Sequence, residues 1–260
     1  MRTRDRGGDR RGMPFSPRPL PRRLATMFPG SAWFDPSRIA QTDNSAIAAY
    51  ADRNYNYALA EATNQATYKA GGTGGGGLGT GGKKPCVLFG SVGSTRLSGA
   101  AALAAYFSDN GPFTIIYRGQ HTAIGGANQA VVGAGTTNFT SNRIFTGCIA
   151  TTGIGRHAHD ANVAAQAGVA AYGTVEATYT TKFSGSRWDT WINSAPDIVN
   201  GTASIADVDT MDLFVLGANR VNGAFNFFAD LKLGHCLVIT AAVNDTIRQA
   251  AEAWVTSEYP

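Results

Sequence analysis

Two histidines at alternating positions, His157 and His159, could hold a metal ion in this 260-residue sequence. In an extended segment their imidazoles would lie on one side, with the carboxylate of Asp160 beside them, and zinc accepts ligands of these types. A zinc site needs three or four protein ligands, and no further ligand follows at a matching spacing. We therefore expect a polar loop over residues 155–162 and no metal site.

Three aspartates, Asp207, Asp209 and Asp212, lie close together and could supply oxygen ligands to calcium. The segment lacks both the glycine turn and the terminal glutamate of a calcium-binding loop. Calcium binding by these aspartates stays open at this stage.

A glycine-rich segment partly imitates a phosphate-binding loop. Nine of the twelve residues 71–82 are glycine, and two lysines follow. In a true phosphate loop, backbone amides cradle the phosphate at the start of a helix. Here Lys84 takes the place of the hydroxyl residue, Pro85 follows, and the next residues favour a strand. Residues 71–82 are therefore predicted to form a flexible surface loop or linker.

Nucleophilic chemistry finds no support in the sequence. There is no G-x-S-x-G motif. The cysteines, Cys86, Cys148 and Cys236, are odd in number, widely spaced and surrounded by apolar residues, which predicts buried thiols in a reducing compartment rather than disulfides or a metal cluster. We expect no enzymatic activity and no cofactor.

Four tryptophans could include a platform for a sugar ring: Trp33, Trp188, Trp191 and Trp254. Trp254 is expected to anchor the last helix in the core. Because successive strand residues point to opposite faces, Trp188 or Trp191, but not both, should face inward. Packing in the core is the main expectation for each ring, so no carbohydrate-binding residue is assigned from the sequence.

Positive charge is concentrated at the N-terminus. The net charge of the chain is +4, but residues 1–23 hold eight arginines against two aspartates, and the rest of the chain is slightly acidic. The eight are Arg2, Arg4, Arg6, Arg10, Arg11, Arg18, Arg22 and Arg23. Five prolines between residues 14 and 29 predict an extended, partly polyproline-like arm over residues 1–29.

Such an arm could bind nucleic-acid phosphates, grip an acidic groove on a partner protein through bidentate carboxylate pairs, or remain a solvated tail. The protein groove is favoured, because prolines preset an extended clamp at low entropic cost. Binding to nucleic acid is not expected.

Short β-branched and aromatic runs, bounded by glycine and proline, recur after the arm. Strands are expected at 83–90, 112–119, 142–152, 186–195, 211–218 and 224–240, with one long strand or a hairpin at 168–183. Within 224–240, one side of the strand should carry Phe225, Phe227, Ala229 and Leu231. A helical turn or two fits 98–109, and one convincing helix follows Asn244 as N-cap, with apolar residues at helical spacing.

This pattern predicts an all-β fold. Residues 30–260 should form an antiparallel jelly-roll β-sandwich, preceded by the extended N-terminal arm and closed by a C-terminal helix. A parallel α/β sheet is disfavoured, because the helices required between parallel strands are missing.

The layout from residue 30 onward resembles the concanavalin A-like lectin/glucanase superfamily, in particular the laminin-G-like domains of phage virion proteins. The resemblance is carried by AWFDPS (32–37), DRNYNYALAEATNQATYK (52–69), KPCVLFGSVGSTRL (84–97), RWDTWINSAPDIVNG (187–201) and EAWVTSEYP (252–260). It implies a jelly roll, a fold that carries glycosidases, lectins and inert scaffolds alike. Laminin-G-like domains sometimes bind calcium through rim carboxylates, which bears on the three aspartates above.

One departure from the superfamily concerns catalysis. Its glucanase branch carries paired acids as E-x-D-x-E, at the spacing that retaining hydrolysis needs. Four isolated glutamates stand here instead: Glu61, Glu176, Glu252 and Glu258. The resemblance therefore implies no hydrolase.

Together these observations predict a phage virion structural protein. It would be a capsid decoration or other particle-surface protein, made in the host cytoplasm, homo-oligomeric, and anchored by its arm to the major capsid or tail proteins. The alternative is a carbohydrate-binding adsorption (receptor-binding) module of a phage tail or head fibre, holding a host glycan. The sequence shows neither an 18-residue apolar span nor the apolar core of a secretory signal.

Overall fold

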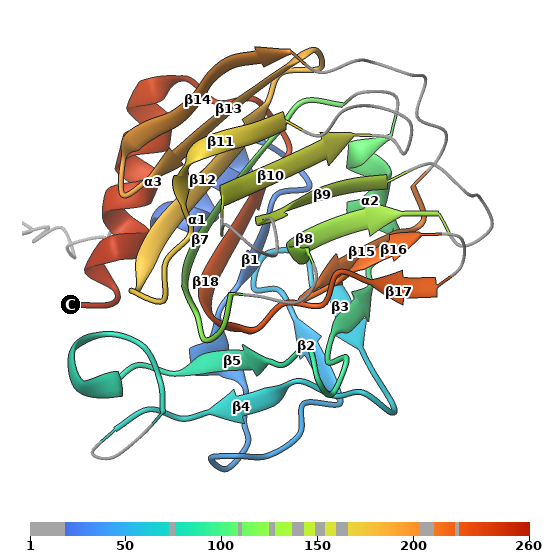
Figure 1. Cartoon of the computed structure of the whole chain (residues 1–260), viewed down its shortest axis with the longest axis vertical. Helices are drawn as coiled ribbons and strands as arrows, with labels where there is room; N and C mark the ends of the chain where they lie inside the picture. The colour runs from blue at the N-terminus through green and yellow to red at the C-terminus, as the bar shows by residue number, and fades with distance from the viewer. Residues whose placement is uncertain are drawn as a thin grey trace, which may run out of the picture.

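Two antiparallel β-sheets pack face to face in the computed structural model (Figure 1). The structure describes residues 19–72, 76–108, 111–124, 128–136, 143–148, 154–159, 166–202, 211–221 and 224–260. As predicted, the fold is a mostly-β sandwich with a C-terminal helix.

The first sheet runs in the order β14 (Ala195–Thr202), β13 (Arg187–Ile192), β12 (Ala177–Phe183), β7 (Phe113–His121), β18 (Leu231–Ile239), β5 (Cys86–Phe89) and β4 (Thr67–Lys69), with β1 (Ala32–Phe34) also paired to β18. The second runs in the order β11 (Gln166–Ala171), β10 (Ile154–His159), β9 (Arg143–Cys148), β8 (Gln129–Gly135), β15 (Leu213–Leu216), β6 (Leu97–Gly99), β3 (Ala58–Ala60) and β2 (Ala49–Ala51). A hairpin of β16 (Asn219–Val221) and β17 (Ala224–Asn226) stands apart.

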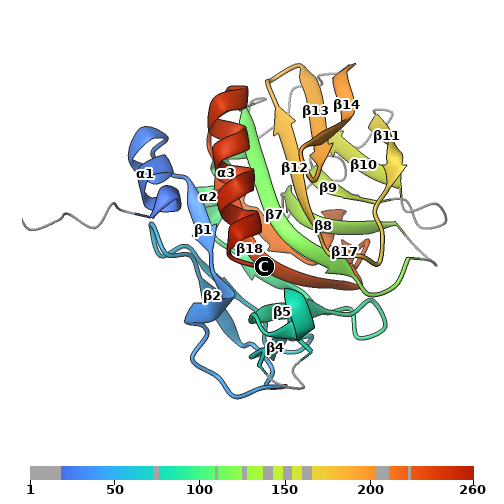
Figure 2. The same ribbon diagram turned by 90° about the vertical axis from the view of Figure 1, so that its left-hand side faces the viewer.

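The central strands of the first sheet are buried on both faces. Along β7, Phe113, Ile115 and Tyr117 face the second sheet, whereas Ile116 belongs to a separate core on the outer face. That outer core is closed by α1 (Leu20–Met27) and α3 (Asp245–Ser257), which lie side by side over the sheet (Figure 2). A strand covered on both sides reads as a continuous apolar run rather than an alternating one, as FTIIY does.

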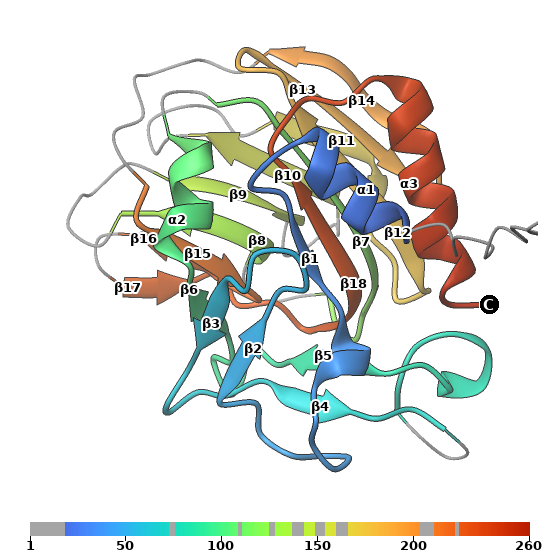
Figure 3. The same ribbon diagram turned by 180° about the vertical axis from the view of Figure 1, so that it is seen from behind.

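Helix α3 forms where it was predicted. The side chain of Asn244 accepts a hydrogen bond from the amide of Ile247 at 3.0 Å, which satisfies an otherwise unpaired donor of the first turn. The predicted helical turn at 98–109 is also present, as α2 (Ala101–Ala104) followed by the 3₁₀ turn η3 (Ala105–Phe107). It lies on the side of the molecule away from α3 (Figure 3).

The predicted extended arm is wrong for its last part, because residues 20–27 form helix α1. Pro21 occupies the first turn of the helix, where its missing amide would have had no intrahelical acceptor. Leu24 is 3% exposed and packs into the outer core. This packing stabilises α1, because a helix of eight residues is not stable through helix propensity alone. Residues 1–18, with Arg2, Arg4, Arg6, Arg10, Arg11 and Arg18, lie outside the described residues.

Two strand predictions and one loop prediction also need correction. Residues 168–183 form neither one strand nor a hairpin, because β11 belongs to the second sheet and β12 to the first. Residues 224–240 are split into β17 and β18, and Phe227 between them has a left-handed backbone with φ of 54°. The segment expected to be a polar loop contains β10, which pairs with both β9 and β11.

As expected, Trp188 and Trp191 point to opposite faces of β13, and only Trp188 faces the core between the sheets. Trp191 is nevertheless buried, because the outer face of β13 is also covered. Trp188 lies between the sheets and is 1% exposed, while Trp191 lies under α3 with the Arg248 guanidinium 4.1 Å from its ring.

The three cysteines are buried free thiols, and burial raises the pKa of each to about 12. Among the described residues, no helix combines the length and apolar character needed to cross a bilayer.

Candidate functional site

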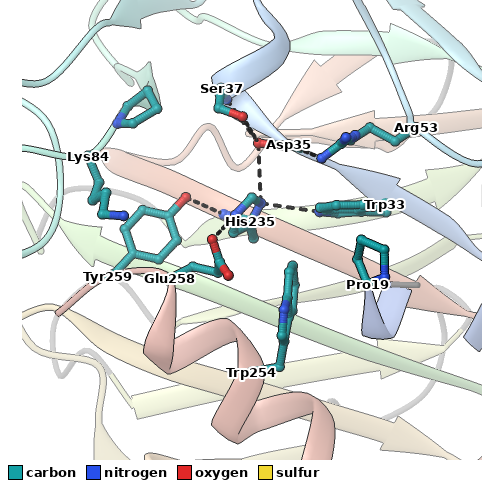
Figure 4. A pocket seen from close by; sticks show the side chains of 11 residues that line it. Pro19, Trp33, Asp35, Ser37, Arg53, Lys84, His235, Trp254, Glu258 and Tyr259 are labelled. Carbon is teal, nitrogen blue, oxygen red and sulfur yellow. Dashed lines mark hydrogen bonds and ion pairs between the residues drawn. The ribbon is translucent and has the colours of Figure 1, made fainter. Parts of the chain in front are cut away.

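A cavity of about 310 Å³ opens at the C-terminal end of α3, over the outer face of the first sheet (Figure 4). Its lining comes from distant parts of the chain: Trp33 and Asp35 from β1 and the turn after it, His235 from β18, and Trp254 and Glu258 from the end of α3. Pro19, at the start of α1, forms part of the rim.

The floor of the cavity is a hydrogen-bonded pair of rings. Trp33 Nε1 donates to His235 Nδ1 at 3.2 Å. Because Nδ1 accepts this bond, the proton of the neutral imidazole is on Nε2, which lies 3.9 Å from Glu258 Oε2. Burial lowers the pKa of His235 to about 4, against the opposing effect of Asp35, so the imidazole is neutral near pH 7.

Asp35 fixes the position of the arginine that covers the Trp33 ring. Its carboxylate is 1% exposed and accepts hydrogen bonds from the Ser37 amide, the Ser37 hydroxyl and Arg53 Nη1 at 2.9, 2.7 and 2.6 Å. The Arg53 guanidinium lies 4.0 Å from the Trp33 ring centre. Asp35 therefore holds Arg53 across the face of Trp33 and has little capacity left for a ligand.

Tyr259, close to the C-terminus, forms the wall of the cavity opposite Arg53 and Trp33 (Figure 4). The Tyr259 hydroxyl accepts a hydrogen bond from the His235 amide at 2.8 Å. The Tyr259 ring passes so close to Gly234 that an added Cβ would come within 2.6 Å of it, which only glycine avoids. Trp254 packs edge-on against Trp33, with the ring centres 5.4 Å apart.

Lys84 completes the cavity, and the structure explains its position. The glycine-rich segment before it was predicted to be flexible, yet its described residues 76–82 are held by specific bonds. The Gly79 amide donates to Glu176 Oε2 and the Thr80 amide to the Pro260 carbonyl, both at 2.6 Å. Lys84 follows this segment and lines the cavity. No carboxylate among the described residues lies within salt-bridge distance of its ammonium group. The residues of the phosphate-loop imitation form only the short 3₁₀ turn η2 (Thr80–Gly82), and the element that follows them is strand β5 rather than an α-helix.

The four isolated glutamates lie in four different places. Glu61 pairs with Arg96 at 2.9 Å, Glu176 with Arg118 at 2.7 Å and Glu252 with Arg248 at 2.8 Å. Only Glu258 of these four reaches the cavity, and its side chain is 41% exposed.

The remaining predicted site residues do not converge here. Arg22 and Arg23 are exposed on α1, and Arg22 also lines a shallow second hollow of about 390 Å³ with Arg53 and Tyr55. Asp160, Asp207 and Asp209, and the side chains of His157 and His159, lie outside what the structure describes; Asp212 is described and follows the buried Met211. The described residues include no group of three or more His, Cys, Asp or Glu suited to a metal ion.

Sequence reasoning missed Asp35, Arg53, His235 and Tyr259. One local signal existed for Asp35, because Asp-Pro-Ser is a typical helix start and Asp35 does cap the 3₁₀ turn η1 (Pro36–Arg38). His235 reaches Trp33 through the pairing of β1 with β18, which joins Trp33 to Leu237. Arg53 is held there by its amide, which donates to the Trp33 carbonyl at 2.8 Å, and Tyr259 by the bond from the His235 amide.

No family model and no curated protein matches the chain. Among solved structures it resembles Trypanosoma rangeli sialidase in complex with sialic acid, with a TM-score of 0.53, 12% identity, and coverage of 87% of this chain and 33% of that one. It also resembles the NanB sialidase of Streptococcus pneumoniae, with a TM-score of 0.51, 11% identity, and coverage of 63% and 26%. This chain therefore corresponds to a third or less of each sialidase. At such identities the likeness shows the fold alone, a mostly-β sandwich of antiparallel sheets.

Proposed function

We propose that this chain is a phage virion structural protein, displayed on the particle surface and anchored by its N-terminal segment to the major capsid or tail proteins. The observation that carries the proposal is the seating of α1. Leu24 is buried in the outer core, and the Tyr55 hydroxyl donates to the Ala25 carbonyl at 3.1 Å. The part of the arginine-rich segment that the structure describes, with Arg22 and Arg23, is therefore held in a fixed position on the sandwich.

The chemistry of that point favours an acidic protein partner. Arg22 and Arg23 are exposed on α1, and neither forms an ion pair with a described residue. Six further arginines precede them in residues 1–18. Guanidinium groups pair with carboxylates in a bidentate geometry, which fixes register as well as strength.

Deletion of residues 1–18 tests the anchor, because it leaves α1 and the sandwich intact. We expect the truncated protein to keep its unfolding temperature but to be lost from particles assembled with the other structural proteins of the phage. Arg22→Glu with Arg23→Glu should weaken incorporation, whereas Arg187→Glu, at an exposed site on β13, should not. Full incorporation of the truncated chain would overturn the anchoring role. Sedimentation of the intact chain tests the homo-oligomer that display on a particle implies.

A non-catalytic role is part of the proposal. Glu61, Glu176 and Glu252 are each held by an arginine, and Asp35 is saturated by three donors. Most glycoside hydrolases need two available carboxyl groups flanking the scissile bond. Glycan turnover by the purified protein would refute this part.

Carbohydrate binding is the second candidate function, and the cavity at the end of α3 favours it. Aromatic rings there stand beside hydrogen-bond donors and acceptors, a combination that suits sugars. A glycan array probed with the intact protein tests this function, and complete absence of binding would leave the structural role alone.

A further inference from the structure

We infer that the cavity at the C-terminal end of α3 binds a neutral pyranose ring, with Trp254 as its stacking platform and Lys84 and Glu258 as its hydroxyl partners. This inference rests on the second proposed function, carbohydrate binding, and assigns it a site and a ligand class.

Trp254 is the ring best placed for stacking. Trp33 is 2% exposed and has the Arg53 guanidinium over its face, which leaves it little surface for a ligand. Trp254 is only partly buried, and it stands between Glu258 and Pro19 with its ring projecting toward the centre of the cavity (Figure 4). A flat apolar ring at this position can cover the C–H face of a sugar.

The polar groups of the wall suit hydroxyls. Lys84 offers donors only, and the Glu258 carboxylate offers acceptors only. A sugar hydroxyl donates and accepts at once, so neighbouring hydroxyls can accept from Lys84 and donate to Glu258. Both side chains lie on the same side of His235, near Tyr259 (Figure 4).

The charge balance favours a neutral ligand. The lining carries two cations, Arg53 and Lys84, and two carboxylates, Asp35 and Glu258. His235 adds no charge near pH 7, because burial lowers its pKa to about 4. A sugar carboxylate would gain from Lys84 but would also face Glu258, so it has no net electrostatic advantage over a neutral sugar.

The size and rigidity of the cavity fit a single ring. Its volume of about 310 Å³ lies at the lower end of the range for small-molecule sites. The floor is already fixed by the bonds from Trp33 to His235, from His235 to Tyr259 and from Arg53 to Asp35. Little side-chain freedom is then lost when a ligand enters, which favours binding.

Ligand-observed NMR titration of the intact chain tests the inference. The probes are the methyl glycosides of glucose, galactose, mannose and N-acetylglucosamine, with glucuronate and galacturonate as charged counterparts. We expect at least one neutral probe to bind. Lys84→Ala and Glu258→Gln should each weaken it about tenfold, the size expected for losing a hydrogen bond to a charged group. Trp254→Ala should abolish it.

Lys83→Ala is the matched control, because Lys83 precedes Lys84 but does not line the cavity. It should bind the sugar as the unaltered chain does. If Trp254→Ala does not fold, the comparison of Lys84→Ala with Lys83→Ala still decides the result.

Three results would overturn the inference. Tighter binding of the uronates would refute the neutral ligand class. Undiminished binding by the Lys84, Glu258 and Trp254 variants would place the sugar elsewhere, and carbohydrate binding itself would stand. No binding of any probe, together with a blank glycan array, would remove the carbohydrate function as well.

Discussion

Removing either partner of the buried Arg248–Glu252 ion pair alone should destabilise the fold more than removing both partners together. The two residues lie on the side of α3 that faces the first sheet and are 3% and 1% exposed. Arg248 Nη1 donates to both carboxylate oxygens at 2.8 Å, and the carboxylate also accepts from the Thr180 and Ser194 hydroxyls at 2.6 and 2.7 Å. The pair is therefore desolvated and fully hydrogen-bonded.

The magnitudes follow from what each variant leaves behind. Arg248→Met strands a buried carboxylate and should cost about 3–5 kcal/mol. Glu252→Leu strands a guanidinium that still has Asp245, at 3.1 Å from Arg248 Nε, so its cost should fall at the lower end of that range. The double variant leaves only two hydroxyls without their acceptor and should cost about 2 kcal/mol. The coupling free energy, which is the sum of the two single losses minus the loss of the double variant, is then about 4 kcal/mol or more.

Urea unfolding followed by tryptophan fluorescence measures all four corners of this cycle. Asp245→Ala is the control, because the Asp245 side chain is 68% exposed and an exposed ion pair contributes at most about 1 kcal/mol. If the double variant loses as much free energy of unfolding as the two single variants combined, the two charges do not stabilise each other, and the predicted coupling is refuted.

Two further perturbations follow from buried groups. Burial lowers the pKa of His121 and His235 to about 4, so between pH 6.5 and 4 the unfolded chain binds more protons than the folded one. Stability should therefore fall with acidification, by up to about 1.4 kcal/mol per pH unit for each histidine, and His121→Gln should flatten the pH dependence of the urea midpoint; an unchanged slope would contradict this. Gly217→Ala should cost about 2–4 kcal/mol, because φ is +81° and the new Cβ would collide with the Phe89 ring. Gly90→Ala meets nothing within 4 Å, and an equal fall in Tm for both variants would refute the argument.

Local signals predicted the parts of the fold that local physics decides. Asn244 and the apolar spacing after it define α3, and aromatic runs define strands such as β7. Helix α1 was not predicted, because the number of prolines in a segment does not show where in a helix each proline would stand. Pro21 lies in the first turn, which tolerates it, and the burial of Leu24 that stabilises the helix is a tertiary contact.

The candidate site was largely beyond local prediction for the same reason. Trp254 was expected to be a core anchor, and it does contact the outer core, but its exposed part lines the cavity. Nothing local marks His235 as a partner of Trp33, since their bond depends on the pairing of β1 with β18. The isolated position of Glu258 in the sequence gave no hint that this residue lies beside a cavity.

The location of the cavity follows from a mismatch of lengths. Helix α3 has 13 residues and spans about 20 Å, whereas the nine-residue strands β7 and β18 each span about 30 Å. The helix therefore cannot cover the whole outer face of the first sheet, and the uncovered part must be sealed by other groups. Trp33, His235 and Tyr259 seal it with rings that are also hydrogen-bonded. The part of the sheet that the short helix leaves uncovered is lined by these polar rings. A ligand can bind there without any change in the core between the two sheets.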